Sequence, residues 1–176
     1  MGVLVDLEER RRAKAAQQSF GRWERRVGFA PGPATRISDL PDAVLSRLAE
    51  LDREATLALY DVVLGVRGWG PGERFTYLES QPKVEALDAF LFLADQVRFD
   101  LMRRLGWVQG VAAESYSLLD MAARPKDIQA SFLPQVPKLT KAYHRYEDLE
   151  RRLALEPAAV VRSLIPEALL VFRNRQ

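Results

Sequence analysis

The chain has 176 residues, no cysteine and a single histidine, His144. Without cysteine, disulfides, thiolate metal sites and cysteine nucleophiles are excluded, and one histidine cannot build a histidine-based zinc site within one chain. The formal net charge is only +2. It is unevenly spread, because residues 1–28 carry seven basic and four acidic side chains (net +3) and residues 29–100 carry seven and twelve (net −5). This balance argues against a broad nucleic-acid face and suggests electrostatic complementarity within or between copies.

The first predicted helix covers residues 3–27. It is dense in helix formers, but residues 10–18 are almost all polar or alanine. Such a helix contributes little core, so we expect residues 1–28 to form an arm that docks at its ends or packs on a partner chain, and residues 29–176 to form the body. The run Arg10-Arg11-Arg12 could contact nucleic acid or anionic lipid, but Glu8 and Glu9 adjoin it, which favours a solvated helix face.

A second long helix is expected from about residue 41 to 66, after a Pro/Gly-rich break. Pro41 suits the first turn and Asp42 suits the helix dipole. Apolar residues at helical spacing form a stripe that contains Asp52. Four charged residues lie on the opposite face and are expected to be solvated: Arg47, Glu50, Glu54 and Asp61.

The strongest helix-breaking stretch is Gly65 to Gly72, with four glycines and one proline. Arg67 and Arg74 lie near it, so an anion-binding loop is one hypothesis. The Gly-Lys-Ser/Thr ending of a P-loop is missing, and no apolar strand precedes the stretch. A helix end followed by a tight turn is therefore the favoured interpretation.

The central helix is predicted over residues 82–105. Leu87, Leu91 and their helical neighbours form an apolar side that continues almost round the helix, which is typical of a buried or interface helix. Only a narrow arc is left for solvent: Glu85, Ala89, Gln96, Asp100 and Arg103.

Three charges interrupt the apolar side of this helix, namely Arg98, Asp95 and Asp88. Buried charges are costly unless they are paired, so Arg98 is expected to have a carboxylate partner. Asp95 lies at i−3, and Asp52 is the candidate from the second helix. The favoured interpretation is a structural ion pair or a pair at a subunit contact, and the alternative is that these four residues form a site for an anionic ligand.

The C-terminal third is less regular. A short helix is expected over residues 112–123, a longer one over 138–155, and a tail split at Pro166. His144 lies beside the stripe of the helix over 138–155 and is expected to be a surface histidine, with a general-base role as the alternative. No segment alternates apolar and polar residues as a strand does.

The sequence therefore predicts an all-α protein, an irregular helical bundle around two long antiparallel helices with a peripheral N-terminal helix. No catalytic motif, cofactor site or metal site can be read. With no apolar leader segment at the N-terminus, the cytoplasm is the expected location and no membrane partner is expected. The favoured function is a helical interaction module that binds itself or another protein. A small anionic ligand in an Arg/Asp pocket is the alternative, and nucleic-acid binding ranks last.

Overall fold

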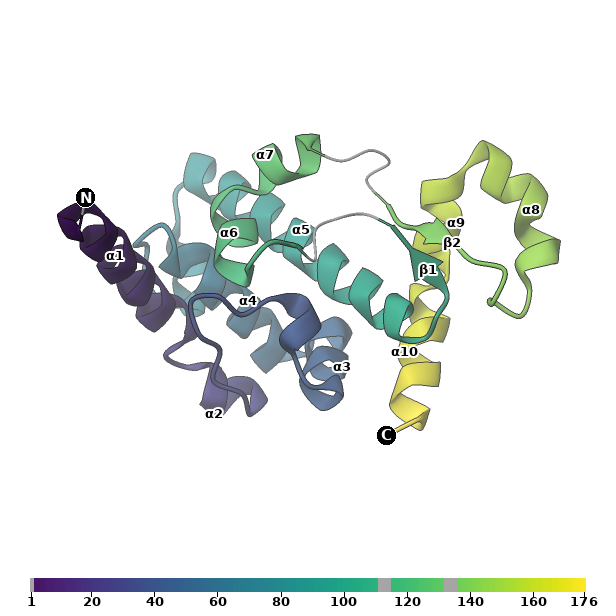
Figure 1. Ribbon diagram of the computed structural model, residues 1–176, viewed down its shortest axis with the longest axis horizontal. Helices are drawn as coiled ribbons and strands as arrows, with labels where there is room; N and C mark the ends of the chain where they lie inside the picture. The colour runs from purple at the N-terminus through teal and green to yellow at the C-terminus, as the bar shows by residue number, and fades with distance from the viewer. Residues whose placement is uncertain (1, 111–114, 132–135) are drawn as a thin grey trace.

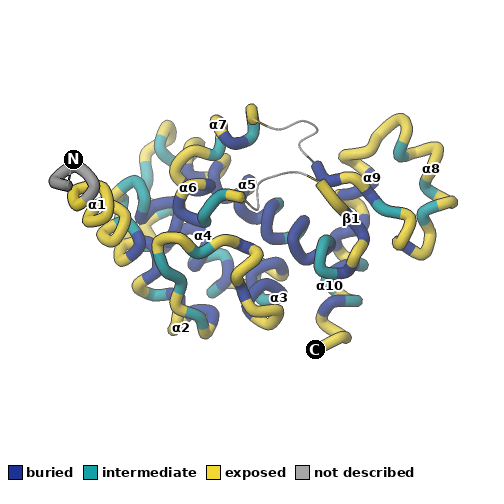
Figure 2. Tube along the Cα trace, in the orientation of Figure 1, coloured by how far each residue is buried: buried dark blue, intermediate teal, exposed yellow. Residues whose placement is uncertain are grey.

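The computed structural model describes residues 2–110, 115–131 and 136–176, and for residues 2–5 only the course of the backbone. The predicted all-α class is confirmed, since the described elements are helices apart from one pair of two-residue strands. Helices α4 (Arg53–Gly65) and α5 (Ser80–Arg104) form the buried centre (Figures 1 and 2). None of the described helices is long and apolar enough to cross a membrane.

The N-terminal segment forms two helices, α1 (Gly2–Phe20) and α2 (Trp23–Val27), where the sequence predicts one. The first half of α1 projects from one end of the molecule (Figure 1). The second half packs closely on α4, where Ser19 Oγ donates to the Val62 carbonyl at 3.4 Å. A side chain at Gly65 would place its Cβ 2.5 Å from Ser19 Oγ, so glycine permits this close approach.

The predicted helix over residues 41–66 is two helices, and the prediction of one continuous helix is wrong. Helix α3 (Asp42–Glu50) follows the 3-10 turn η1 (Ile37–Asp39) and ends at Leu51, whose φ of 55° is left-handed. Asp52 then caps α4, accepting a hydrogen bond from the Ala55 N–H at 2.8 Å. An aspartate within an apolar stripe here begins a new helix, as N-cap preferences allow.

The glycine-rich stretch ends α4 in a tight turn, which confirms the favoured interpretation. Trp69 N–H donates to the Leu64 carbonyl at 3.0 Å, and the turn uses left-handed φ values of 70° at Gly68 and 96° at Gly70. The 3-10 helix η2 (Gly72–Tyr77) follows and packs on α4. Phe75 of η2 and Phe90 of α5 both stack on Tyr60, each with ring centroids 4.3 Å apart.

The exposed side of α5 differs from the predicted one. Ala89, Gln96 and Asp100 are buried, whereas Leu87 and Leu91 are 40% and 52% exposed. Sequence periodicity identifies a helix that is apolar nearly all round but cannot tell which apolar residues the neighbouring helices cover. Here α3, α4, α6 and α10 surround the helix and leave the side with Leu87 and Leu91 uncovered.

The C-terminal region contains the only strands among the described residues. Strand β1 (Val108–Gln109) pairs antiparallel with β2 (Lys138–Leu139), so the expected helical start at residue 138 is wrong and helix begins at α8 (Tyr146–Leu155). The predicted helix over 112–123 begins only at α6 (Leu118–Ala123), and residues 112–114 of that prediction lie outside the described chain. Helix α7 (Pro125–Ala130) follows α6.

The split tail is confirmed as α9 (Pro157–Ser163) and α10 (Ile165–Asn174), each with a proline in its first turn. Helices α8 and α9 and the small sheet occupy the end of the molecule opposite the projecting α1 (Figure 1).

Candidate functional site

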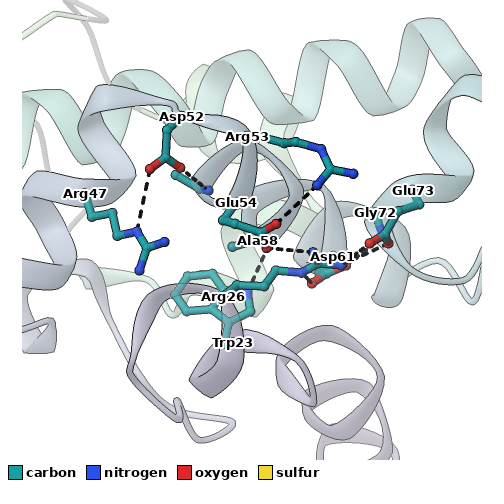
Figure 3. Close-up of polar contacts among 11 residues, drawn as sticks. Trp23, Arg26, Arg47, Asp52, Arg53, Glu54, Ala58, Asp61, Gly72 and Glu73 are labelled. Atoms are coloured by element: carbon teal, nitrogen blue, oxygen red, sulfur yellow. Dashed lines mark hydrogen bonds and ion pairs between the residues drawn. The ribbon is translucent and has the colours of Figure 1, made fainter.

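A buried arginine, Arg26, links three elements of the N-terminal half (Figure 3). Its side chain is 2% exposed, and its Nε donates to Asp61 Oδ2 of α4 at 2.6 Å. Its Nη2 donates to Glu73 Oε1 of η2 at 2.8 Å, and its Nη1 donates to Glu54 Oε2 at 3.2 Å. One guanidinium thus joins α2, α4 and η2.

Further hydrogen bonds hold the same junction of α2, α4 and η2 together. Trp23, one turn before Arg26, is fully buried and donates its Nε1–H to the Ala58 carbonyl at 2.9 Å. Asp61 also accepts the Gly72 N–H at 2.6 Å, which binds the glycine-rich turn to α4. A Cβ at Gly72 would lie 2.5 Å from the Leu57 carbonyl oxygen, so this approach requires glycine.

The charges in this junction shift one another's pKa. Burial raises the pKa of Asp61, while Arg26 and the Gly72 N–H oppose that shift by stabilising the carboxylate. The hydrogen bond from Arg26 lowers the pKa of Glu73. Burial acts to lower the pKa of Arg26, but its bonds to Asp61 and Glu73 raise it above its ordinary value. The guanidinium is therefore held in its charged form, with carboxylates of α4 and η2 as its partners.

The sequence predicts Glu54 and Asp61 as solvated residues, and for Asp61 that prediction is wrong because its side chain is 0% exposed. Arg26 and Trp23 are not among the predicted site residues. The sequence signals only part of this, since Phe20, Trp23 and Val27 are spaced as one helical face but Arg26 lies at its edge, about 60° beyond Trp23. The partners of Arg26 lie 28 to 47 residues away, beyond the reach of local periodicity.

A hollow of about 360 Å³ lies next to this junction, between the end of α1 and the glycine-rich turn. Arg22 is its one charged residue; the others are Gln17, Gln18, Gly65, Gly68, Gly70 and Pro71. The side chain of Arg22 is half-buried and forms no hydrogen bond or ion pair with the described residues. Its charge acts on Asp61 and Glu73, which offset part of its attraction for an anion.

The four residues predicted as a cluster do not come together around Arg98. Arg98 Nε donates to the Ala49 carbonyl in the last turn of α3 at 3.1 Å. Asp95 is bonded to Arg162 of α9 at 2.6 Å. Burial lowers the pKa of Arg98, and the charge of Asp95 opposes this shift. Arg98 thus bonds the end of a helix, where carbonyl oxygens lack partners and a cation is favoured.

The two remaining members lie elsewhere. Asp52 caps α4 and has Oδ2 3.7 Å from Arg47 Nε (Figure 3). Asp88 is exposed on α5, beside a hollow of about 300 Å³ between α5 and α7 that Lys126 also lines. The structure therefore forms no pocket from the four predicted residues.

The lower-ranked candidate residues His144 and Arg67 make contacts that connect parts of the fold. His144 is 61% exposed, with Nε2 3.4 Å from Glu167 Oε1, while the Tyr143 hydroxyl donates to the other oxygen of Glu167 at 2.6 Å. Arg67 donates to the carbonyls of Val63 and Ala122 and pairs with Glu85 at 3.0 Å, so it ties α4 to α6 and α5.

Arg74 is exposed on η2, with its side chain folded against the glycine-rich turn. A Cβ built at Gly70 would lie 3.1 Å from Arg74 Cγ. Among the described residues, no group of three or more His, Asp or Glu side chains could hold a metal ion.

The uncovered side of α5 presents a row of exposed apolar residues. Val84, Leu87 and Leu91 are 59%, 40% and 52% exposed and follow the i, i+3, i+7 spacing of one helical face. Asp88 and Asp95 share this face, which we call the α5 face. Such spacing of apolar anchors is the pattern by which one helix docks on another.

Comparison of the chain with protein-family models, with curated proteins and with solved structures gives no match.

Proposed function

We propose that this protein is a helical interaction module that docks a second helix on the α5 face. The observation that carries the proposal is the exposure of Val84, Leu87 and Leu91 on a helix whose other large apolar side chains are buried. Single exposed apolar residues are ordinary on protein surfaces, but a row of them on one helix marks an interaction surface.

The rest of α5 supports this proposal by its rigidity. Neighbouring helices bury most of its girth, and its last turn is fixed by Arg104, which bonds Asp100 and Asp42. The α5 face therefore needs no rearrangement to receive a partner helix, which limits the entropic cost of association.

The test compares wild type with Leu91→Glu by sedimentation velocity over a range of concentrations. We expect wild type to associate, and we expect the introduced charge to return it to a monomer, because burying an unpaired carboxylate is costly. Leu155→Glu is the matched control, since Leu155 is 83% exposed at the far end of the molecule. Equal association of wild type and Leu91→Glu would contradict docking of copies on this face.

A second candidate function is binding of a small anion in the hollow beside the glycine-rich turn. Half-buried Arg22, whose side chain lacks a hydrogen-bond partner among the described residues, favours it. Phosphate should then raise the melting temperature of wild type in a saturable way and leave that of Arg22→Gln unchanged, because a ligand that binds only the folded state stabilises it. We rank this function second because Asp61 and Glu73 offset the charge of Arg22.

A further inference from the structure

The projecting half of α1 is an exposed helix with a small excess of basic side chains, and its body-facing side, at Arg12, borders a hollow shared with residues 33–36 and α6. Every residue from Asp6 to Lys14 is exposed, whereas Ala16, Ser19 and Phe20 are buried. In Figure 2 this half is exposed along its described length and extends away from the other helices. Helix α1 therefore extends beyond the residues through which it packs on α4.

The acidic and basic residues of this half of α1 lie on different faces of the helix. At about 100° per residue, Arg11 and Lys14 fall within about 40° of Leu7, on the side opposite Ala16 and Phe20. Glu8 and Glu9, close in sequence to the arginines, project about 100° and 160° away from Leu7. The outward side, which we call the α1 face, thus presents one apolar residue and a row of cations.

The α5 face is complementary to the α1 face. It offers apolar side chains at Val84, Leu87 and Leu91 and a carboxylate at Asp88, whereas Asp95 is already paired with Arg162. The Asp88 carboxylate forms no hydrogen bond or ion pair with any described residue, so its charge is available to a partner. The same complementarity holds for the segments, since residues 1–28 carry +3 and residues 29–100 carry −5.

We propose that the helix docked on the α5 face is the projecting half of α1 from a second copy of this chain. This inference rests on the proposed function and names its partner. Each copy has both faces, so a one-way exchange would continue into open chains, whereas a reciprocal exchange closes as a twofold dimer. The apolar contact provides affinity, and the charge pairs select the partner and make association sensitive to salt.

The test uses charge reversal in the full-length chain. Arg11→Glu and Asp88→Arg should each raise the dimer dissociation constant about tenfold or more at low ionic strength. The double variant Arg11→Glu/Asp88→Arg should recover most of this loss, because the pair is restored with its signs exchanged. Arg12→Glu is the control, since Arg12 is equally basic but projects away from the α1 face; we expect a change of less than about twofold.

The outcomes separate this inference from the proposed function. If Leu91→Glu abolishes association but Arg11→Glu does not weaken it, the α5 face docks a different helix and the inference is overturned while the function stands. If Arg11→Glu and Arg12→Glu weaken association equally, the effect is one of net charge and the inference is also overturned. Binding of anionic vesicles or nucleic acid by the α1 face, without dimer formation, would contradict it as well.

Discussion

The two halves of the N-terminal segment are similarly rich in arginine, yet they have opposite fates. Between Ala15 and Val27, Trp23 and Arg26 are buried against α4, whereas every side chain from Asp6 to Lys14 is exposed. The difference lies in what the body offers. Asp61, with Glu54 and Glu73, surrounds Arg26, whereas residues 6–14 of the outer half stay exposed, even where Arg12 borders the body. Composition therefore does not decide whether an arginine-rich helix is part of the core; distant carboxylates do.

The largest loss of stability is expected from a substitution in the inner half of the N-terminal segment, residues 15–27. Arg26→Ala should lower the free energy of unfolding by about 3–5 kcal/mol, because it strands the fully buried Asp61 without its cation. Urea denaturation measures this loss, and Arg25→Ala, at an exposed neighbour, should change stability by less than about 0.5 kcal/mol. A loss from Arg26→Ala no larger than that of the control would show that the network contributes nothing.

A smaller loss of stability is expected from replacing Arg98, the other internal arginine. Arg98→Ala should cost about 1–2 kcal/mol, since its described hydrogen bond is to a helix-end carbonyl and no buried carboxylate is stranded. The same denaturation measurement checks the order of the two variants. If Arg98→Ala were the more damaging, the comparison of their surroundings would be wrong.

Low pH should weaken the ion pair between Arg26 of the inner half and Glu73 of η2. Its pKa is lowered in the folded state, so its contribution is present above its ordinary pKa of 4.5 and is lost as pH falls through the folded value. Asp61 acts in the opposite direction because burial raises its pKa, but this contribution is common to wild type and to Glu73→Gln. Below pH 4.5, the melting temperature of wild type should therefore fall more steeply than that of Glu73→Gln. Parallel curves would contradict the role of Glu73.

The smallest effect on the fold is expected from the outer half. Deleting residues 2–14 should change the free energy of unfolding of the monomer by less than about 0.5 kcal/mol, because the described side chains removed are exposed. Deleting residues 2–28 also removes Trp23 and Arg26 and should leave a chain that unfolds at much lower denaturant concentration. Far-UV circular dichroism during urea titration compares the two, and similar midpoints would remove the distinction between the halves.

The sequence predicts the fold class and the position of most helices because helical periodicity and breakers are local. The break at Leu51 and Asp52 escapes prediction, since an aspartate in an apolar stripe is compatible with both a buried charge and a helix cap. The sequence also does not predict which residues form ion pairs. Arg98 is expected to need a carboxylate, but the end of α3 supplies a carbonyl, and the carboxylates surround Arg26 instead.

The α5 face cannot be located from the sequence for a related reason. A helix that is apolar nearly all round has no unique inward side, and only the positions of α3, α4, α6 and α10 decide that Val84, Leu87 and Leu91 remain uncovered. The boundary at residue 28 stays a prediction, and burial within the segment instead changes near Ala15.

The most direct test of reciprocal docking is native mass spectrometry of an equimolar mixture of Arg11→Glu and Asp88→Arg chains. Each chain alone should be mainly monomeric, because the first variant brings two carboxylates together at each contact and the second brings two guanidinium groups together. In a mixed dimer, both contacts regain one positive and one negative partner, so we expect a heterodimer whose mass distinguishes it from either homodimer. A mixture that stays as monomeric as its two components would contradict the exchange of α1 between copies.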